Sequence, residues 1–211
     1  MAQDIIARQR LRLSAEKLQP KGPKNIYLHV TGQVQSGSFR GEEPLACTYD
    51  FSYGPDWRIQ EGPALATNDS QYSINDHSRK SGATVVWNFP IAATFSTTNA
   101  YGWPRLVLTV QDNKKGNCVG YGAVLLPTRA GKYTRYVHMF APIASSPLQE
   151  FLGWLLSAPA EFRDTKFAAR NNDREVTRVK SHGIVKVTLN VTTKNMEHFG
   201  YTESITLNTK N

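Results

Sequence analysis

A long alternation of apolar and polar residues, from residue 84 to residue 95, constrains the fold more than any other feature. Its apolar face carries Val85, Trp87, Phe89, Ile91, Ala93 and Phe95. A period of two residues is typical of a β-strand with one buried face. Two more runs with strand character follow within about forty-five residues, at 106–110 and 118–127, with no helical period between them. Together these runs predict an antiparallel sheet.

Further strands are predicted on both sides of this stretch, at 26–34, 45–53, 57–60, 71–74, 133–140, 175–179 and 184–192. In the run 45–53 the apolar face carries Leu45, Cys47, Tyr49, Phe51 and Tyr53. The residues between them are small or polar, which predicts that the opposite face of this strand is in water. The inward face of the last strand is expected to carry Val185, Val187, Leu189 and Val191.

One helix is expected in this mainly β chain, at residues 147–157. Ser146 provides a hydroxyl cap, Pro147 fits the first helical position, and a glutamine stands three residues after the cap. The apolar residues that follow have the spacing of a single buried stripe: Leu148, Phe151, Leu152 and Leu155. This helix is predicted to pack across one end of the sheet structure.

The chain is predicted to contain one β-domain, at residues 25–193. A basic extension at 1–24 has a thin amphipathic pattern, which fits either a short helix on a partner or lipid surface or a frayed terminus. A polar tail occupies 194–211. A length of 211 residues suits one well-buried domain with additions.

The net charge of +8 favours an acidic partner, whether an anionic membrane surface, an acidic protein face or a nucleic acid. The sequence shows neither a signal-peptide pattern nor an apolar run long enough for a membrane span, so a cytosolic, soluble or peripheral protein is expected. In that reducing compartment, Cys47 and Cys118 are interpreted as buried thiols.

Several motifs occur in one order between residues 25 and 201, namely VVWNFPI, the turn NAYGWP and the run VGYGAVLLP. This set resembles the B9 domain, a divergent branch of the C2-type β-sandwich found in proteins of the ciliary transition zone. Later motifs, FLGWLLSAPAEFRD, REVTRVKSHGIVKVTLNVTTKNM and FGY, narrow the match to one member of that family.

The resemblance implies a C2-like antiparallel sandwich of about eight strands with one inserted helix. It also implies a non-catalytic scaffold, needed for ciliogenesis, on the cytoplasmic side of the ciliary base, at the transition zone and basal body, in association with the cytoskeleton. The implied partners of this hetero-oligomer are a second B9 protein, the Meckel syndrome type 1 protein and a tectonic-type membrane complex that gates protein entry to the cilium. A calcium-independent module for anionic phospholipid is the alternative function, and no nucleic-acid partner is expected.

Calcium binding is not expected, and no metal or cofactor is predicted. Calcium-dependent C2 domains hold the ion with three aspartates in one loop, because Ca²⁺ takes six to eight hard oxygen ligands. The run VQDNKKGNCVG places Asp112, Lys114 and Asn117 at those positions, so one carboxylate remains. An ammonium group in place of a ligand adds repulsion to the lost oxygen. The other ligand loop offers Asp56 alone.

Catalytic signatures are absent from the sequence. The five histidines lie far apart without a zinc-protease spacing, and the glycines after Val119 lack the third glycine and the helix of a dinucleotide site. The run 119–126 approaches an RNA-recognition consensus in which Tyr121 would stack on a base. The preferred interpretation is that Tyr121 and its glycine neighbours shape a strand of the sandwich.

Seven residues are candidate contacts for a protein or lipid partner. Lys114 and Lys115 could meet phosphate or an acidic face without a metal, the alternative being a solvated loop tip. The turn holding Tyr101 and Trp103 could be an interface anchor or a plug for the end of the sandwich. The remaining candidates, from a basic run near the C-terminus, are Arg174, Arg178 and Lys180.

Overall fold

A computed structural model describes residues 22–39, 45–62, 73–74, 84–112, 117–143 and 178–201. The strands in these residues form one antiparallel sheet with the order β3–β5–β1–β9–β8–β7–β6–β2–β4. Their bounds are β1 (Ile26–Ser38), β2 (Leu45–Ser52), β3 (Trp57–Glu61), β4 (Ser73–Ile74), β5 (Thr84–Thr97), β6 (Arg105–Asp112), β7 (Cys118–Leu125), β8 (Gly131–Pro142) and β9 (Val179–Lys194). A short 3-10 helix, η2 (Glu197–Phe199), follows β9. The expectation of about eight antiparallel strands is confirmed, with the two-residue β4 as a ninth.

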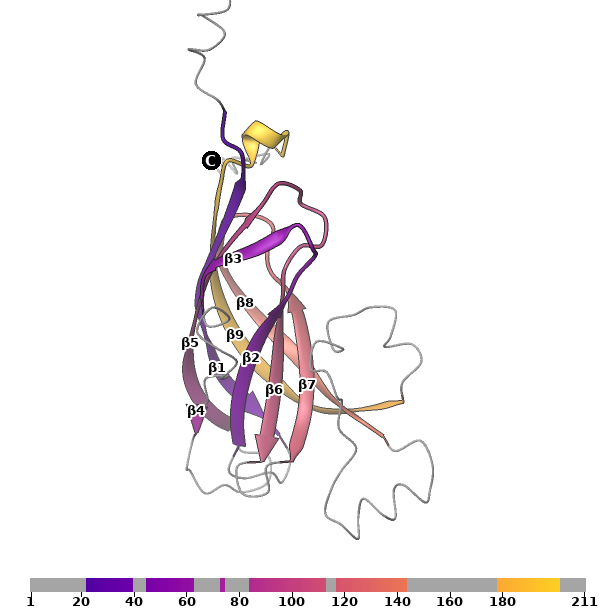
Figure 1. Cartoon of the computed structure of the whole chain (residues 1–211). Helices are drawn as coiled ribbons and strands as arrows, with labels where there is room; N and C mark the ends of the chain where they lie inside the picture. Colours follow the sequence, from indigo (N-terminus) through magenta and orange to yellow (C-terminus); the bar gives the residue numbers. More distant parts are fainter. Residues whose placement is uncertain are drawn as a thin grey trace, which may run out of the picture.

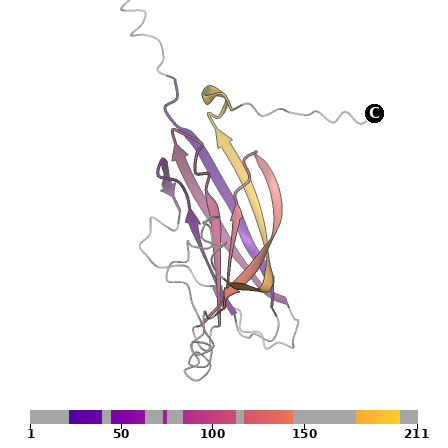
Figure 2. The same ribbon diagram turned by 90° about the vertical axis from the view of Figure 1, so that its right-hand side faces the viewer.

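The sheet folds over on itself into two layers (Figure 1). One layer contains β5, β1, β9 and β8, and the other contains β7, β6 and β2. Strands within each layer pair along most of their length, whereas β7 and β8 share a single pair, Tyr121 with Phe140. The side view in Figure 2 shows the two layers curving past one another. The molecule is therefore a sandwich whose layers are hydrogen-bonded at one corner, in agreement with the predicted C2-like class.

The core lies between the layers and follows the predicted alternation closely. All six apolar residues expected on the inner face of β5 are at most 7% exposed. The four inward residues of β9 are at most 1% exposed. The expected inward residues of β6, Leu106, Leu108 and Val110, are fully buried as well. A period of two residues was thus sufficient to locate the main core.

The prediction that one face of β2 is in water is wrong. Ala46 and Thr48, on the face opposite Cys47, are 4% and 9% exposed. The Thr48 hydroxyl lies 3.4 Å from the Thr109 carbonyl of the neighbouring strand, so a polar side chain is buried with a partner. A second apolar cluster, formed by Val107, Cys118, Tyr121 and Phe140, is separate from the main core. Tyr53, expected on the inner face, lies beyond the end of β2 and is 39% exposed.

The C-terminal strand is longer than predicted. The sequence suggested two strands, at 175–179 and 184–192, with a break between them, whereas the structure has one continuous strand from Val179, β9, between β8 and β1. Residues 175–177 lie outside the described residues. Gly183, with φ of 102°, stands where the break was expected, and a Cβ there would lie 2.5 Å from the Phe39 ring. The glycine is thus needed for close packing within a strand. The helix predicted at 147–157 and the extension up to residue 21 lie outside the described residues.

Candidate functional site

Two turns interlock at one end of the sandwich. The first joins β2 to β3 through Gly54, and the second joins β5 to β6 through Gly102. The Gly54 N–H donates to the Gly102 carbonyl at 2.8 Å. Gly102 has φ of 72°, and a Cβ on it would stand 2.6 Å from the Gly54 Cα. The close approach of the two backbones therefore requires glycine at both positions.

Two indole rings lie directly beneath these turns. The Trp57 Nε1–H donates to the Tyr101 carbonyl at 2.9 Å, and the Trp103 Nε1–H donates to the Leu126 carbonyl at 3.0 Å. The two rings meet edge to face with centroids 5.0 Å apart. Trp103 is partly buried against the core. Its place in the molecule fits the predicted plug of the sandwich end, while its use as a partner contact stays a prediction.

Tyr101 points away from the same turn and is 77% exposed. Its backbone is held from both sides, because its N–H donates to the Asn99 side-chain oxygen at 3.0 Å and its carbonyl accepts from Trp57. A large aromatic side chain on a fixed backbone loses little conformational entropy when a partner covers it. Of the two aromatic candidates, Tyr101 is the one with the geometry of an anchor.

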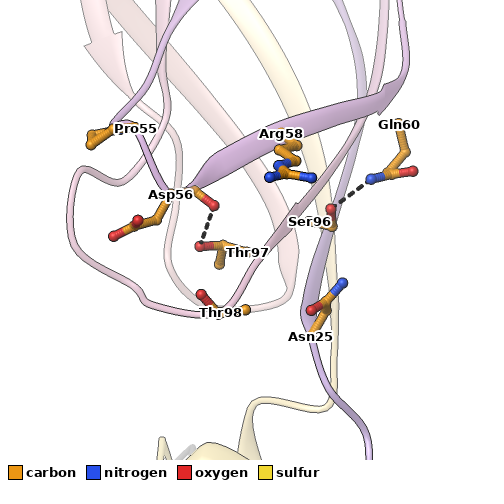
Figure 3. Close-up of a pocket in the computed structure, with 8 residues that line it drawn as sticks. All are labelled: Asn25, Pro55, Asp56, Arg58, Gln60, Ser96, Thr97 and Thr98. Carbon is orange, nitrogen blue, oxygen red and sulfur yellow. Dashed lines mark hydrogen bonds between the residues drawn. The ribbon is translucent and has the colours of Figure 1, made fainter.

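A polar pocket of about 300 Å³ lies beside these turns, between β3, β5 and the start of β1 (Figure 3). Its inner wall is formed by Ser96 and Thr97, which are 3% and 2% exposed. The Ser96 hydroxyl accepts a hydrogen bond of 2.7 Å from the Gln60 side chain, and the Thr97 hydroxyl lies 3.1 Å from the Asp56 carbonyl. The lining residues are Asn25, Pro55, Asp56, Arg58, Gln60, Ser96, Thr97 and Thr98.

The chemistry of this pocket suits a small polar or anionic group. Arg58 supplies a guanidinium, and the Asp56 carboxylate points away from it in Figure 3. The sequence did not reveal the pocket, because its lining residues come from three segments far apart in the chain. An alternation pattern shows which residues point outward, but not which strand ends meet.

The basic candidate residues lie far from the aromatic turn. Arg178 and Lys180 are exposed at the opposite end of β9, where Lys180 pairs with Ala141 of β8. The other end of β9, at Lys194, pairs with the start of β1 beside the pocket. The two ends are separated by about 45 Å of strand path. Three further candidates lie outside the described residues: Lys114, Lys115 and Arg174.

The two aspartates considered for calcium also lie at opposite ends of a strand. Asp112 pairs with Leu45 at the start of β2, whereas Asp56 follows the end of β2. The eight-residue strand between them spans about 25 Å. One ion cannot bridge that distance, since Ca²⁺–oxygen bonds are 2.3–2.6 Å long. Within the described residues, no three His, Cys, Asp or Glu side chains are close enough together to hold a metal ion.

Two residues considered for other chemistry are buried. Tyr121 is 2% exposed, so it cannot present its ring to a nucleic-acid base. A Cβ on the adjacent Gly122 would lie 2.5 Å from the Met139 sulfur, so this glycine lets β8 cross closely over β7. Burial raises the pKa of the Cys47 thiol to about 12, which leaves it protonated and unreactive at neutral pH. In the part of the chain that is described, no helix is long and apolar enough to cross a membrane.

One charged feature was not singled out from the sequence. The four strands of the β5–β1–β9–β8 layer contain no Asp or Glu residue. Their basic residues are Lys132, Arg135, Lys180, Lys186 and Lys194. In the sequence Asp173 and Glu175 stand within the basic run that contains Lys180 and Lys186. Strand pairing brings Lys132 and Arg135 of β8 beside Lys186 of β9.

The comparisons with known proteins agree with this fold. A family model described as "Ciliary basal body-associated, B9 protein" matches residues 28–192. B9 domain-containing protein 1 of Xenopus laevis is 43% identical over 183 residues, covering 85% of this chain and 90% of that protein. The Homo sapiens protein of the same name is 41% identical over 182 residues, covering 85% and 87%. B9 domain-containing protein 2 of Xenopus laevis is 22% identical over 180 residues, covering 84% and 98%. The chain belongs to the B9 family of ciliary basal body-associated proteins.

Proposed function

We propose that this B9 protein is a non-catalytic subunit of a hetero-oligomeric assembly at the cytoplasmic side of the ciliary base. Family membership supports the basal body as the general location. The observation that carries the assembly role is the exposed Tyr101 on a turn fixed by the Gly54–Gly102 contact. An aromatic side chain presented on a rigid backbone is typical of the residues that dominate protein interfaces.

The finer part of the proposal concerns the partners and the site. The relatives include both B9 domain-containing protein 1 and B9 domain-containing protein 2, so a second B9 protein is the first partner we propose. The Meckel syndrome type 1 protein and a tectonic-type membrane complex are the others. Together they form a gate at the ciliary transition zone. The sandwiches meet over an interface of about 1,600 Å², the size of a standard specific complex.

Co-expression tests this proposal directly. The tagged full chain is produced together with a second B9 protein from the same organism, and the ratio of the two proteins in the eluate is measured. A stoichiometric complex supports the assembly role. The variant Tyr101→Ala should weaken the complex at least tenfold, because anchor residues cost about 2 kcal/mol or more when truncated. Tyr27→Ala, at another exposed tyrosine, is the matched control.

Binding to anionic phospholipid is a second candidate function, and the layer without carboxylates favours it. The test is sedimentation of the purified chain with phosphatidylserine vesicles in the presence of a chelator. Binding that is strong in low salt and lost in high salt would support a calcium-independent electrostatic mode. If the chain stays in the supernatant while the B9 complex forms, the membrane contact belongs to another subunit.

A further inference from the structure

The two margins of the β5–β1–β9–β8 layer differ in how their backbone groups are used. At the β5 margin, the Trp87 indole donates to the Leu45 carbonyl of β2 at 3.1 Å. In the opposite direction, the Tyr49 phenol of β2 receives a hydrogen bond from the backbone of Ala92. Pro90, in the same stretch, has no N–H to offer. Residues 94–97 of this margin also pair with β3, and the stretch around Trp87 and Ala92 is held to β2 by these bonds between side chains and backbone.

The β8 margin is open over the first half of the strand. On its inner side β8 pairs with β9 from Gly131 to Pro142, but on its outer side its one pairing is that of Phe140 with Tyr121. Among the described residues, none forms a ladder with the outer side of residues 132–136, whereas Gly122 of β7 approaches Val137 and His138 closely. The side chains of Lys132, Thr134 and Tyr136 are exposed, and that of Tyr136 is 63% exposed.

This open margin is protected by charge alone. Natural edges are blunted by prolines, bulges, very short strands or charged side chains, and of these the open stretch of β8 has only the charges of Lys132 and Arg135. Between residues 132 and 138, β8 contains no proline and no residue with positive φ, and its register shift lies beyond His138. The stretch 132–136 spans about 17 Å, the length of a typical strand. Within the described residues its outward backbone groups have no ladder partner, so they can pair with an incoming strand.

The charges at this margin specify the chemistry of the occupant. Lys132 and Arg135 stand on the open stretch, and Lys186 lies opposite Tyr136 on the adjacent strand. The four-stranded layer has no carboxylate to compensate them. A second copy of this chain would place like charges side by side if the two β8 margins paired, which is destabilising. Arg135 lies opposite the buried Val187 and so is on the inner face of the layer, whereas Lys132 and Lys186 are on the outer face. Carboxylates at alternate positions of an incoming strand would be attracted to the two outer lysines.

We propose that the outer edge of β8, at residues 132–136, binds an extended acidic segment of another protein, which adds to the layer as a further strand. The backbone ladder supplies affinity, and carboxylates of the segment on the face of Lys132 and Lys186 select it. This inference deepens the proposed assembly role, on which it rests for the presence of a protein partner. It names a contact surface different from the Tyr101 turn.

A short peptide tests the inference on the full chain. The probe is a capped heptapeptide of alternating glutamate and valine, with glutamate at both ends, and binding is followed by fluorescence anisotropy and by backbone hydrogen exchange. We expect binding to slow exchange at the outward amides of residues 132–136. An N-methylated peptide, which cannot form the ladder, should bind at least tenfold more weakly. A peptide with lysine in place of glutamate should not bind.

Charge reversal provides the matched comparison. The double variant Lys132→Glu with Lys186→Glu should lower the affinity for the acidic peptide about tenfold or more, since both lysines are on the face of the peptide's carboxylates. Lys24→Glu with Lys194→Glu makes the same change in net charge away from β8 and should alter affinity less than twofold. Urea unfolding of both variants checks that they fold as well as the parent chain.

Three results would overturn the inference. The first is peptide binding without protection of the amides of residues 132–136. The second is equal loss of affinity in the two double variants, which would indicate a diffuse electrostatic attraction. The third is preferential binding to phosphatidylserine vesicles that does not slow backbone hydrogen exchange along β8. That result would indicate that the basic layer binds lipid. If the complex with a second B9 protein forms while any of these is observed, the assembly role stands and the β8 edge is not its contact.

Discussion

The hydrogen bond between Trp87 and Leu45 offers a quantitative test of how the two layers are held together. Trp87 is 7% exposed, and its indole is the donor to the carbonyl of a fully buried residue of the other layer. The substitution Trp87→Phe keeps an aromatic ring but removes this donor. A buried carbonyl left without a partner costs about 1–3 kcal/mol. The smaller ring loses about 1 kcal/mol more of apolar burial.

We therefore expect Trp87→Phe to lower the free energy of unfolding by about 3 kcal/mol. For a chain of this length, that loss corresponds to a fall of about 6–12 °C in the midpoint of thermal unfolding. Urea unfolding followed by circular dichroism at the β-sheet band measures it without relying on the tryptophan signal. The midpoint should fall while the slope stays constant, because the surface exposed on unfolding is nearly unchanged.

The same substitution at Trp103 is the control. Its indole also donates to a backbone carbonyl, but the ring is only partly buried, so water can replace the lost donor. Trp103→Phe should cost about 1 kcal/mol. If Trp87→Phe costs no more than Trp103→Phe, the bond across the layers is not a significant source of stability. The Trp87 bond would then contribute little to closing the β5 margin.

Three further predictions follow from close contacts and burial. Gly32→Ala should destabilise the fold by about 3 kcal/mol in urea unfolding, because its Cβ would stand 2.1 Å from the Thr188 carbonyl oxygen and push β1 from β9; a loss below 1 kcal/mol would contradict this. Gly102→Ala should lower the free energy of unfolding by about 2 kcal/mol, because φ is 72° and the new Cβ would contact Gly54. An unchanged stability would show that the two turns can separate without cost. The Cys47 thiol has a folded pKa raised by burial from 9.0 to about 12, so its contribution to stability is complete below pH 9 and is lost as the pH rises towards 12. The free energy of unfolding should fall by up to about 1.4 kcal/mol per pH unit over that range, and Cys47→Ala should flatten the profile.

The alternation in the sequence was a reliable guide to the core because one face of most strands is buried. In β5 and β9 every residue expected to point inward does so. The same rule failed for β2, where Ala46 and Thr48 are buried on the second face. Small side chains such as alanine and threonine occur both on solvated faces and on faces covered by protein. Burial on two faces therefore cannot be predicted from alternation alone.

The candidate sites were less predictable, because they depend on which strands become neighbours. The sequence identified Tyr101 and Trp103 together, yet the structure turns one outward and the other against the core. Hydrogen bonds that join positions 42 residues apart, such as that of Trp87 with Leu45, leave no local signal. The basic layer likewise becomes visible only when β8 and β9 are placed beside β1.

The position of β9 between β1 and β8 also determines how this protein can be made. During synthesis β1 leaves the ribosome long before β9, and the pairing of Val30 with Val191 joins residues from nearly opposite ends of the chain. Long-range pairing of this kind makes folding slow. Until Val179 and the residues after it emerge, β1 and β8 each expose an unpaired side, and a chaperone would need to shield them. A translation stop just before β9 would therefore be as harmful as one near the start.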